Sequence, residues 1–101
     1  MAAYLIITAK VHDRAAFMAG YAPAAEALLQ RHGGRYVLRA PGAELIEGGH
    51  GEGASIVISE WPDKATALAF WNSPDYVEVK RLRDGLADVN VLLVEAPAIG
   101  G

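Results

Sequence analysis

Three segments of the chain carry large apolar side chains at neighbouring positions, where a half-exposed strand would alternate apolar with polar residues. They are Ala3–Val11, Ala54–Trp61 and Val89–Glu95, and each is rich in the branched or aromatic residues that strands favour. Successive side chains of a strand point to opposite faces, so Leu5 and Ile6, for example, need burial on different faces. A sheet made from these segments must therefore be covered on both sides.

Two helical stretches separate the strands. Residues 14–32 place apolar side chains at helical spacing, and a short strand, Arg35–Arg39, follows them. The second stretch covers residues 64–72 and continues from a Ser73–Pro74 start to about Leu86. The order is therefore β-α-β-β-α-β. This order predicts an α+β, ferredoxin-like fold, in which a four-stranded antiparallel sheet has two helices on one face.

The helix over residues 14–32 is expected to be interrupted. Pro23 lacks an amide proton and its ring clashes with the carbonyl four residues earlier, so we expect a kink or break at Gly20–Ala22. Asp13 is the predicted N-cap, because its carboxylate can accept a free amide hydrogen of the first turn. Gly33–Gly34 is the predicted end of the helix, since glycine adopts the left-handed conformation at little cost.

The chain between the second and third strands is rich in glycine. Residues 43–48 (AELIEG) predict a further extended piece that continues the second strand after a bulge, and residues 48–53 (GGHGEG) predict a hairpin tip. A length of 101 residues corresponds to one domain. We expect that domain to cover residues 1–96, with a frayed tail at 97–101.

The predicted sheet has one face without cover. Two helices can cover only one face of a four-stranded sheet, although the strands carry apolar residues on both. The simplest cover for the other face is the same face of a second copy, because a symmetric pair buries both open faces at once. We therefore expect a homodimer with the two sheets packed face to face.

Composition argues against several classes of function. The formal net charge of −3 gives no electrostatic footprint for nucleic acid, and no apolar run reaches the roughly 20 residues of a membrane span. We therefore expect neither nucleic acid nor a membrane as a partner. The absence of cysteine fits a reducing compartment, so we expect a cytoplasmic protein. His12, His32 and His50 lack metal-ligand spacing, and we expect no metal and no cofactor.

The natural pocket of this fold lies between the helices and the sheet, and the break near Pro23 opens it. Tyr21 is at that break, where its hydroxyl can orient a ligand; the alternative is an aromatic residue at the edge of the core with its hydroxyl in water. Four further candidates gather where the second helical stretch is interrupted and offer a rigid wall with polar tips: Trp71, Asn72, Ser73 and Tyr76. The alternative is that Ser73 only caps the helix and Trp71 only packs.

Charged candidates complete the predicted site. Arg83 shares one helical stripe with Tyr76 and Lys80 and can bind a carboxylate or phosphate; the alternative is a solvated face. Arg39 and Glu60 are predicted to lie on or near strands, and Glu60 acquires a role in the site if it is buried near Arg39. Glu60 is the candidate acid/base residue, and structural ion pairing is the alternative.

Several stretches together resemble the DUF1330 family, whose name records that its function is not established. The most specific are AFWNSPDY at residues 69–76 and KRLRDG at residues 80–85. The weaker ones are residues 4–7, 21–25, 32–36 with Arg39, 47–48, 60–62 and 91–95. The pair Glu60–Trp61, followed by a helix and S-P-x-aromatic, is also similar, more distantly, to the antibiotic-biosynthesis monooxygenases. The resemblance implies a dimeric α/β barrel, in which two ferredoxin-like subunits face their sheets.

Two hypotheses for function follow. In the first, the protein binds a small organic acid or aromatic molecule in the helix–sheet pocket, or transforms it without a cofactor. The residues assigned to this function are Tyr21, Trp71, Asn72, Ser73 and Tyr76 as ligand contacts, Arg39 and Arg83 as anion-binding groups, and Glu60 as the proton-transfer group. In the second, the chain is a non-catalytic structural or interaction module, whose polar cluster only fixes the dimer and the helix junction.

Overall fold

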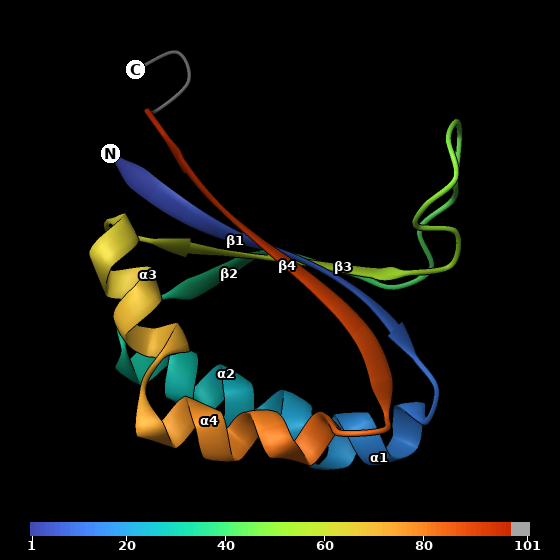
Figure 1. The fold of residues 1–101 in the computed structure, drawn as a ribbon, viewed down its shortest axis with the longest axis horizontal. Helices are drawn as coiled ribbons and strands as arrows, with labels where there is room; N and C mark the ends of the chain where they lie inside the picture. The colour runs from blue at the N-terminus through green and yellow to red at the C-terminus, as the bar shows by residue number, and fades with distance from the viewer. Residues whose placement is uncertain (98–101) are drawn as a thin grey trace.

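A computed structural model of the chain describes residues 1–97, and its elements follow the expected order with each helical stretch divided (Figure 1). The elements are β1 (Ala2–Val11), α1 (Arg14–Ala19), α2 (Tyr21–Arg31), β2 (Arg35–Ala40), β3 (Ser55–Trp61), α3 (Lys64–Trp71), α4 (Pro74–Lys80), the 3-10 helix η1 (Arg81–Arg83) and β4 (Ala87–Ala96). The predicted α+β, ferredoxin-like architecture is confirmed. The predicted tail falls mainly on residues 98–101, which lie outside the described residues.

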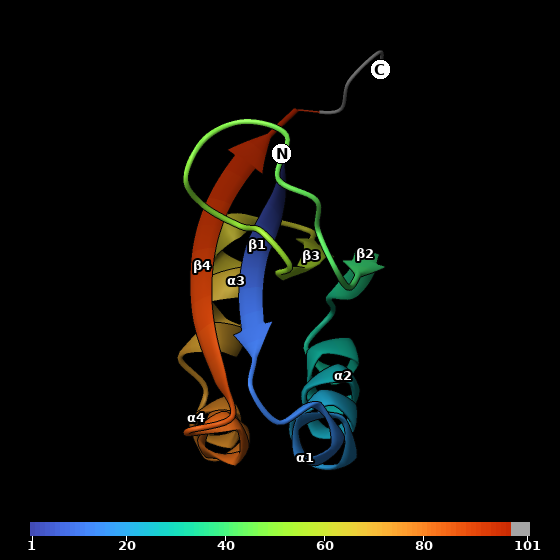
Figure 2. The same cartoon turned by 90° about the vertical axis from the view of Figure 1, so that its right-hand side faces the viewer.

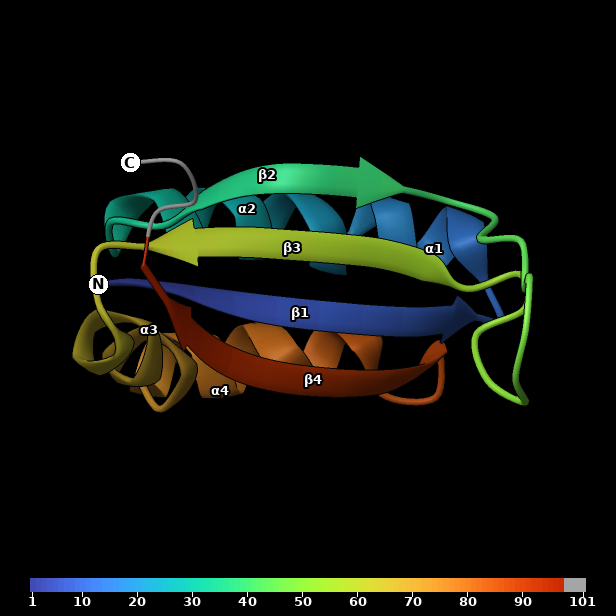
Figure 3. The ribbon, with the colours of Figure 1, turned by 90° about the horizontal axis from the view of Figure 1, so that it is seen from above.

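The four strands form one antiparallel sheet in the order β2-β3-β1-β4 (Figure 3). The helices lie on one face of it (Figure 2). In the central strand β1, the side chains that face the helices include Leu5, which lies opposite Ser59 of β3 and Leu93 of β4. The intervening residues of each strand point to the opposite, open face.

The predicted break in the first helical stretch is confirmed. The carboxylate of Asp13 caps α1 by accepting the amide of Ala16 at 3.0 Å, and α1 ends where the amide of Gly20 donates to the carbonyl of Ala16. Pro23 lies in the first turn of α2, where its missing amide hydrogen has no intrahelical partner to lose. The break therefore lets two short helices follow the curved sheet.

The second helical stretch divides between α3 and α4 for similar reasons. Asp63 caps α3 by accepting the amide of Thr66 at 2.7 Å. Ser73 caps α4 by accepting the amide of Tyr76 at 3.1 Å, and Pro74 begins the helix. The α-helical part ends at Lys80, earlier than the predicted Leu86, and tightens into η1.

A bulge in β2 determines which of its side chains face the helices. The pairing of β2 with β3 shifts register between Tyr36 and Leu38, so that Val37 is an extra residue. Arg35 lies opposite Glu60 on the open face, whereas Arg39 lies opposite Val57 on the helix face. In a regular strand of the same sequence, Arg35 and Arg39 would share one face, because they are four positions apart.

The predicted extension of β2 over residues 43–48 is wrong. The glycine-rich connection from β2 to β3 forms an irregular loop, whose backbone hydrogen bonds join Ala43 to Gly53 and Ala54, and Ala54 to Gly51. Gly42 has a positive φ of 70°, which turns the chain out of the extended conformation directly after β2. The loop leaves the sheet at the end of β2 and rejoins it at β3 (Figure 3).

The main core lies between α2, α3, α4 and the sheet. Its largest members are aromatic: the Trp61 and Phe70 rings are 4.9 Å apart, and Phe70 and Tyr76 are 4.7 Å apart. The Trp61 indole is only 1% exposed and donates to the Ser59 hydroxyl at 2.9 Å. Gly34 lies directly against this ring, so the chain can pass from α2 into β2 only where no side chain intervenes.

The open face of the sheet is apolar along its middle, as the strand pattern predicts. Ile6 lies between Ile58 of β3 and Leu92 of β4 in register, and Leu92 is 65% exposed in the single chain. No part of the described chain covers these residues with a helix (Figure 2). The open face is thus an apolar surface that a monomer would leave in water.

Candidate functional site

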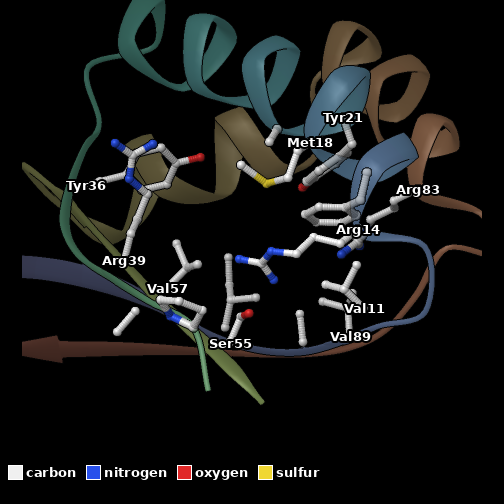
Figure 4. A pocket seen from close by; sticks show the side chains of 16 residues that line it. Val11, Arg14, Met18, Tyr21, Tyr36, Arg39, Ser55, Val57, Arg83 and Val89 are labelled. Carbon is white, nitrogen blue, oxygen red and sulfur yellow. The ribbon is translucent and has the colours of Figure 1, made fainter. Parts of the chain in front are cut away.

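A pocket of about 350 Å³ lies between α1, the start of α2 and the sheet (Figure 4). This volume is at the lower end of the range that small-molecule sites occupy. Its walls are largely apolar, with Ile7 and Val57 on the sheet and Phe17 and Met18 on α1. The break at Gly20 places the pocket beneath two short helices, at the position expected for this fold.

Three arginine side chains reach this pocket, namely Arg14, Arg39 and Arg83. Arg39 forms an ion pair with Glu26 at 2.5 Å, and its guanidinium lies 4.9 Å from the centre of the Tyr36 ring. Arg83 lies 5.4 Å from the centre of the Tyr21 ring, in a cation–π contact. None of the pocket-lining residues in the described chain is Asp or Glu, so the site is net positive.

Two tyrosine hydroxyls meet at the edge of the pocket. The Tyr21 and Tyr76 oxygens are 2.7 Å apart, although only Tyr21 lines the pocket and Tyr76 is 2% exposed. Burial, followed by the neighbouring Tyr21 hydroxyl, raises the pKa of Tyr76 far above its ordinary value of 10. Burial also raises the pKa of Tyr36, another pocket residue, to about 12. Tyr36 and Tyr76 therefore stay neutral at physiological pH and can donate hydrogen bonds.

These raised pKa values predict a loss of stability in alkali. Tyrosines of the unfolded chain ionise near pH 10, whereas Tyr36 keeps its proton in the folded chain until about pH 12. The unfolded state therefore binds fewer protons in that window, and the free energy of unfolding falls by about 1.4 kcal/mol per pH unit for each such tyrosine. Urea unfolding at pH 9, 10 and 11 measures the slope. Tyr76→Phe should make it shallower, and an unchanged slope would contradict the assignment.

The remaining aromatic and polar candidates lie beside the pocket rather than in its wall. Trp71 packs on Tyr76 with ring centres 5.0 Å apart, and the Lys80 ammonium lies 4.9 Å from the Trp71 ring. Ser73 caps α4, and Asn72 is an exposed residue at the end of α3. The structure thus brings Trp71, Ser73 and Tyr76 together at the helix junction, and the Tyr21–Tyr76 hydrogen bond joins this group to the pocket.

Glu60 lies on the open face of the sheet, and does not meet Arg39. Its carboxylate accepts hydrogen bonds from Arg35 at 2.6 Å and from the Tyr4 hydroxyl at 2.9 Å. The bond from Arg35, followed by that from Tyr4, holds the pKa of Glu60 below its usual value. Glu60 and Arg39 are not neighbours, because the β2 bulge places Arg35 and Arg39 on opposite faces, and Glu60 forms its ion pair with Arg35.

Sequence reasoning found three of the pocket-lining residues and missed others. Tyr21, Arg39 and Arg83 line the pocket as expected. Arg14 was missed, although it is four positions before Met18, a spacing that places both on one stripe of α1. The apolar residues of the same stretch indicate a core-facing helix, and nothing in the spacing indicates that a charged residue of that helix lines a pocket.

The described residues carry no cluster of three or more His, Cys, Asp or Glu side chains arranged to hold a metal ion. Within residues 1–97, no helix combines the length and the apolar character that crossing a membrane requires.

The antiparallel sheet in the order β2-β3-β1-β4, with its helices on one face and a pocket beneath them, defines a ferredoxin-like α+β protein. The chain belongs to the family described as domain of unknown function (DUF1330), whose model matches residues 2–97. The resemblance inferred from the sequence is therefore confirmed. No curated protein matches the chain.

Several solved structures share the fold. RPA0582, a protein of unknown function from Rhodopseudomonas palustris, is similar with a TM-score of 0.77 and 17% identity, over 96% of this chain and 83% of its own. SnoaB, a cofactor-independent oxygenase from Streptomyces nogalater, is similar with a TM-score of 0.69 and 19% identity, over 98% and 96%. An antibiotic biosynthesis monooxygenase is similar with a TM-score of 0.54 and 17% identity, over 95% and 99%. At these identities the likeness concerns the fold.

Proposed function

We propose that the protein binds a small organic acid or aromatic molecule in the pocket between α1, α2 and the sheet. The observation that carries the proposal is the pocket itself, about 350 Å³ with apolar walls and a few converging polar side chains. Apolar walls give affinity by removing a ligand's carbon surface from water, and the arginines and tyrosines fix its orientation. Trp71, Asn72 and Ser73 support the site from the helix junction in this proposal.

The pocket favours binding over acid–base chemistry of its own. A general base at neutral pH needs a group that is deprotonated there, such as a carboxylate or a histidine. The described residues that line the pocket include neither, and Glu60 lies on the other face of the sheet. The fold is shared with SnoaB, a cofactor-independent oxygenase, so the proposal includes a reaction of the bound molecule without a cofactor. The bound molecule itself would then have to supply most of the reactivity.

A second candidate function is a structural module without a ligand. The contact that favours it is the Tyr21–Tyr76 hydrogen bond, which joins α2 to α4, with Trp71 packed against the same ring. In this case the polar groups only hold the two helix junctions together. Substituting these polar groups would then lower the stability of the protein without changing the binding of any ligand.

A pocket-filling substitution distinguishes the two functions. Ala22 lines the pocket from α2, whereas Ala27 is an exposed residue of the same helix. We expect 2-naphthoate or 2-naphthamide, added as probes, to shift the amide resonances of Ile7 and Val57 in protein NMR spectra. Ala22→Phe should weaken this binding at least tenfold because its ring occupies the cavity, and Ala27→Phe should leave it unchanged. If neither probe binds to the unsubstituted protein, the result favours the structural module.

We also propose that the protein is a homodimer in which the open faces of two sheets pack on each other. The exposed Leu92 beside Ile6 and Ile58 supports this arrangement, because burying an apolar face is the main favourable term in association. The helix–sheet pocket of each subunit is on the far side of its sheet. Dimerisation would therefore leave both pockets open to ligand.

A further inference from the structure

We propose that the ligand is an aromatic carboxylate and that Arg14, together with Arg83, holds its carboxylate group. This inference rests on the proposed function, since it specifies the ligand of that same pocket. It assigns the anion-binding role to Arg14, which the sequence pattern had not singled out, and it places the anion away from Arg39. The three guanidinium groups differ in whether a carboxylate already pairs with them.

Arg39 is already engaged. Its guanidinium forms an ion pair with Glu26 and lies over the Tyr36 ring, so both its charge and its flat face have partners. A ligand carboxylate at Arg39 would have to compete with Glu26. The net attraction for an anion at that end of the pocket is correspondingly small.

Arg14 and Arg83 have no carboxylate partner in the described chain, although Arg83 lies over the Tyr21 ring. Within residues 1–97 neither forms an ion pair or a side-chain hydrogen bond with a carboxylate, although both line the pocket. Figure 4 shows the Arg14 side chain extending from the start of α1 into the pocket, with Arg83 at the same end and Arg39 at the other. Guanidinium groups stay charged at all physiological pH values, so this end of the cavity carries positive charge without compensation.

The shape and chemistry of the pocket select the kind of anion. A planar carboxylate matches the fork of a guanidinium group with two parallel hydrogen bonds. Beyond the two arginines, the walls are formed by Phe17, Met18 and Val57, which favour the carbon skeleton of a ring. An anion with an apolar, flat body therefore satisfies both ends of the cavity.

The tyrosine pair adds a directed hydroxyl to this end. Among residues 1–97, the only hydrogen-bond partner of the buried Tyr76 hydroxyl is the Tyr21 hydroxyl, at 2.7 Å. If Tyr76 donates this bond, the hydrogen of Tyr21 is free to point into the pocket, where it can reach a carboxylate oxygen. Tyr76 would then act as a positioning residue for Tyr21.

The test compares two probes of nearly equal shape, 2-naphthoate and the uncharged 2-naphthamide, titrated into the intact protein at a fixed salt concentration. We expect naphthoate to bind at least tenfold more tightly, with shifts at pocket amides. Arg14→Gln should abolish this preference, whereas Arg81→Gln should preserve it, because Arg81 neighbours Arg83 in η1 but pairs with Glu78 outside the pocket. Arg14→Lys keeps the charge without the fork and should retain part of the preference. Thermal melting of each variant shows that the fold is intact.

Each other outcome overturns the inference in a recognisable way. Equal binding of the two probes would refute the anion while the pocket function stands. A preference that survives Arg14→Gln and disappears in Arg39→Gln would refute Arg14 as the anchor. If neither probe binds, the inference and the proposed function fail together.

Discussion

Replacing Gly34 with alanine is expected to destabilise the protein by about 2–3 kcal/mol, as overpacking of a rigid core does. A Cβ atom at this position would lie 2.6 Å from the Cζ2 atom of Trp61. The indole cannot move aside easily, because it is buried, hydrogen-bonded to Ser59 and packed on Phe70. For a domain of this length the loss corresponds to a fall in melting temperature of roughly 10 °C or more, measurable by circular dichroism.

Gly20→Ala is the matched control. Its added Cβ would meet only the Ala16 carbonyl oxygen at 3.5 Å, and its φ of −108° suits any residue. We expect an unchanged melting temperature or a rise, since alanine restricts the unfolded chain by about 0.4–1 kcal/mol. If Gly34→Ala melted like Gly20→Ala, the close packing of Gly34 on Trp61 would be incorrect.

Leu92→Arg is expected to convert the proposed dimer into a monomer. In the single chain Leu92 is 65% exposed, so the arginine costs little within one subunit. In the dimer the same position lies in the apolar middle of the open face, where each subunit would bury an unpaired charge. Sedimentation equilibrium should give the monomer mass of 10.7 kDa for the variant and twice that value for the unsubstituted protein.

Val77→Arg provides the comparison for this experiment. Val77 is 46% exposed on α4, on the helix side of the sheet, so the same substitution there should leave the dimer intact. A monomer for the unsubstituted protein would refute the face-to-face arrangement directly. A dimer that persists in Leu92→Arg would show that another surface holds the subunits together.

Local sequence rules were sufficient to predict the fold. The caps at Asp13 and Ser73 and the break before Pro23 depend on neighbours within a few positions, and all three are confirmed. The apolar residues on both faces of β1 correctly indicated a sheet with helices on one side and an unpartnered apolar surface on the other. These features could be predicted because each depends on a short stretch of chain.

The site was harder to predict, because it depends on how strands pair. The separation of Arg39 from Glu60 follows from one extra residue at Val37, and nothing in the sequence of β2 marks that position as a bulge. The helical spacing of Arg14 and Met18 places them on one stripe of α1, but that this stripe lines a pocket depends on how α1 packs over the sheet. The candidates that follow from a helical stripe, Tyr21 and Arg83, do line the pocket.

The bulge at Val37 has a consequence for how pockets of this family can diverge. Tyr36 already lies opposite Ser59, and Leu38 lies opposite the adjacent Ile58, so deleting Val37 would restore regular pairing and leave Tyr36 at the pocket and Arg35 on the open face. The strand could thus lose one codon here and keep the same pocket wall. Among relatives, a gap at this position would therefore carry no information on ligand preference, and differences in the wall formed by β2 would have to come from substitutions.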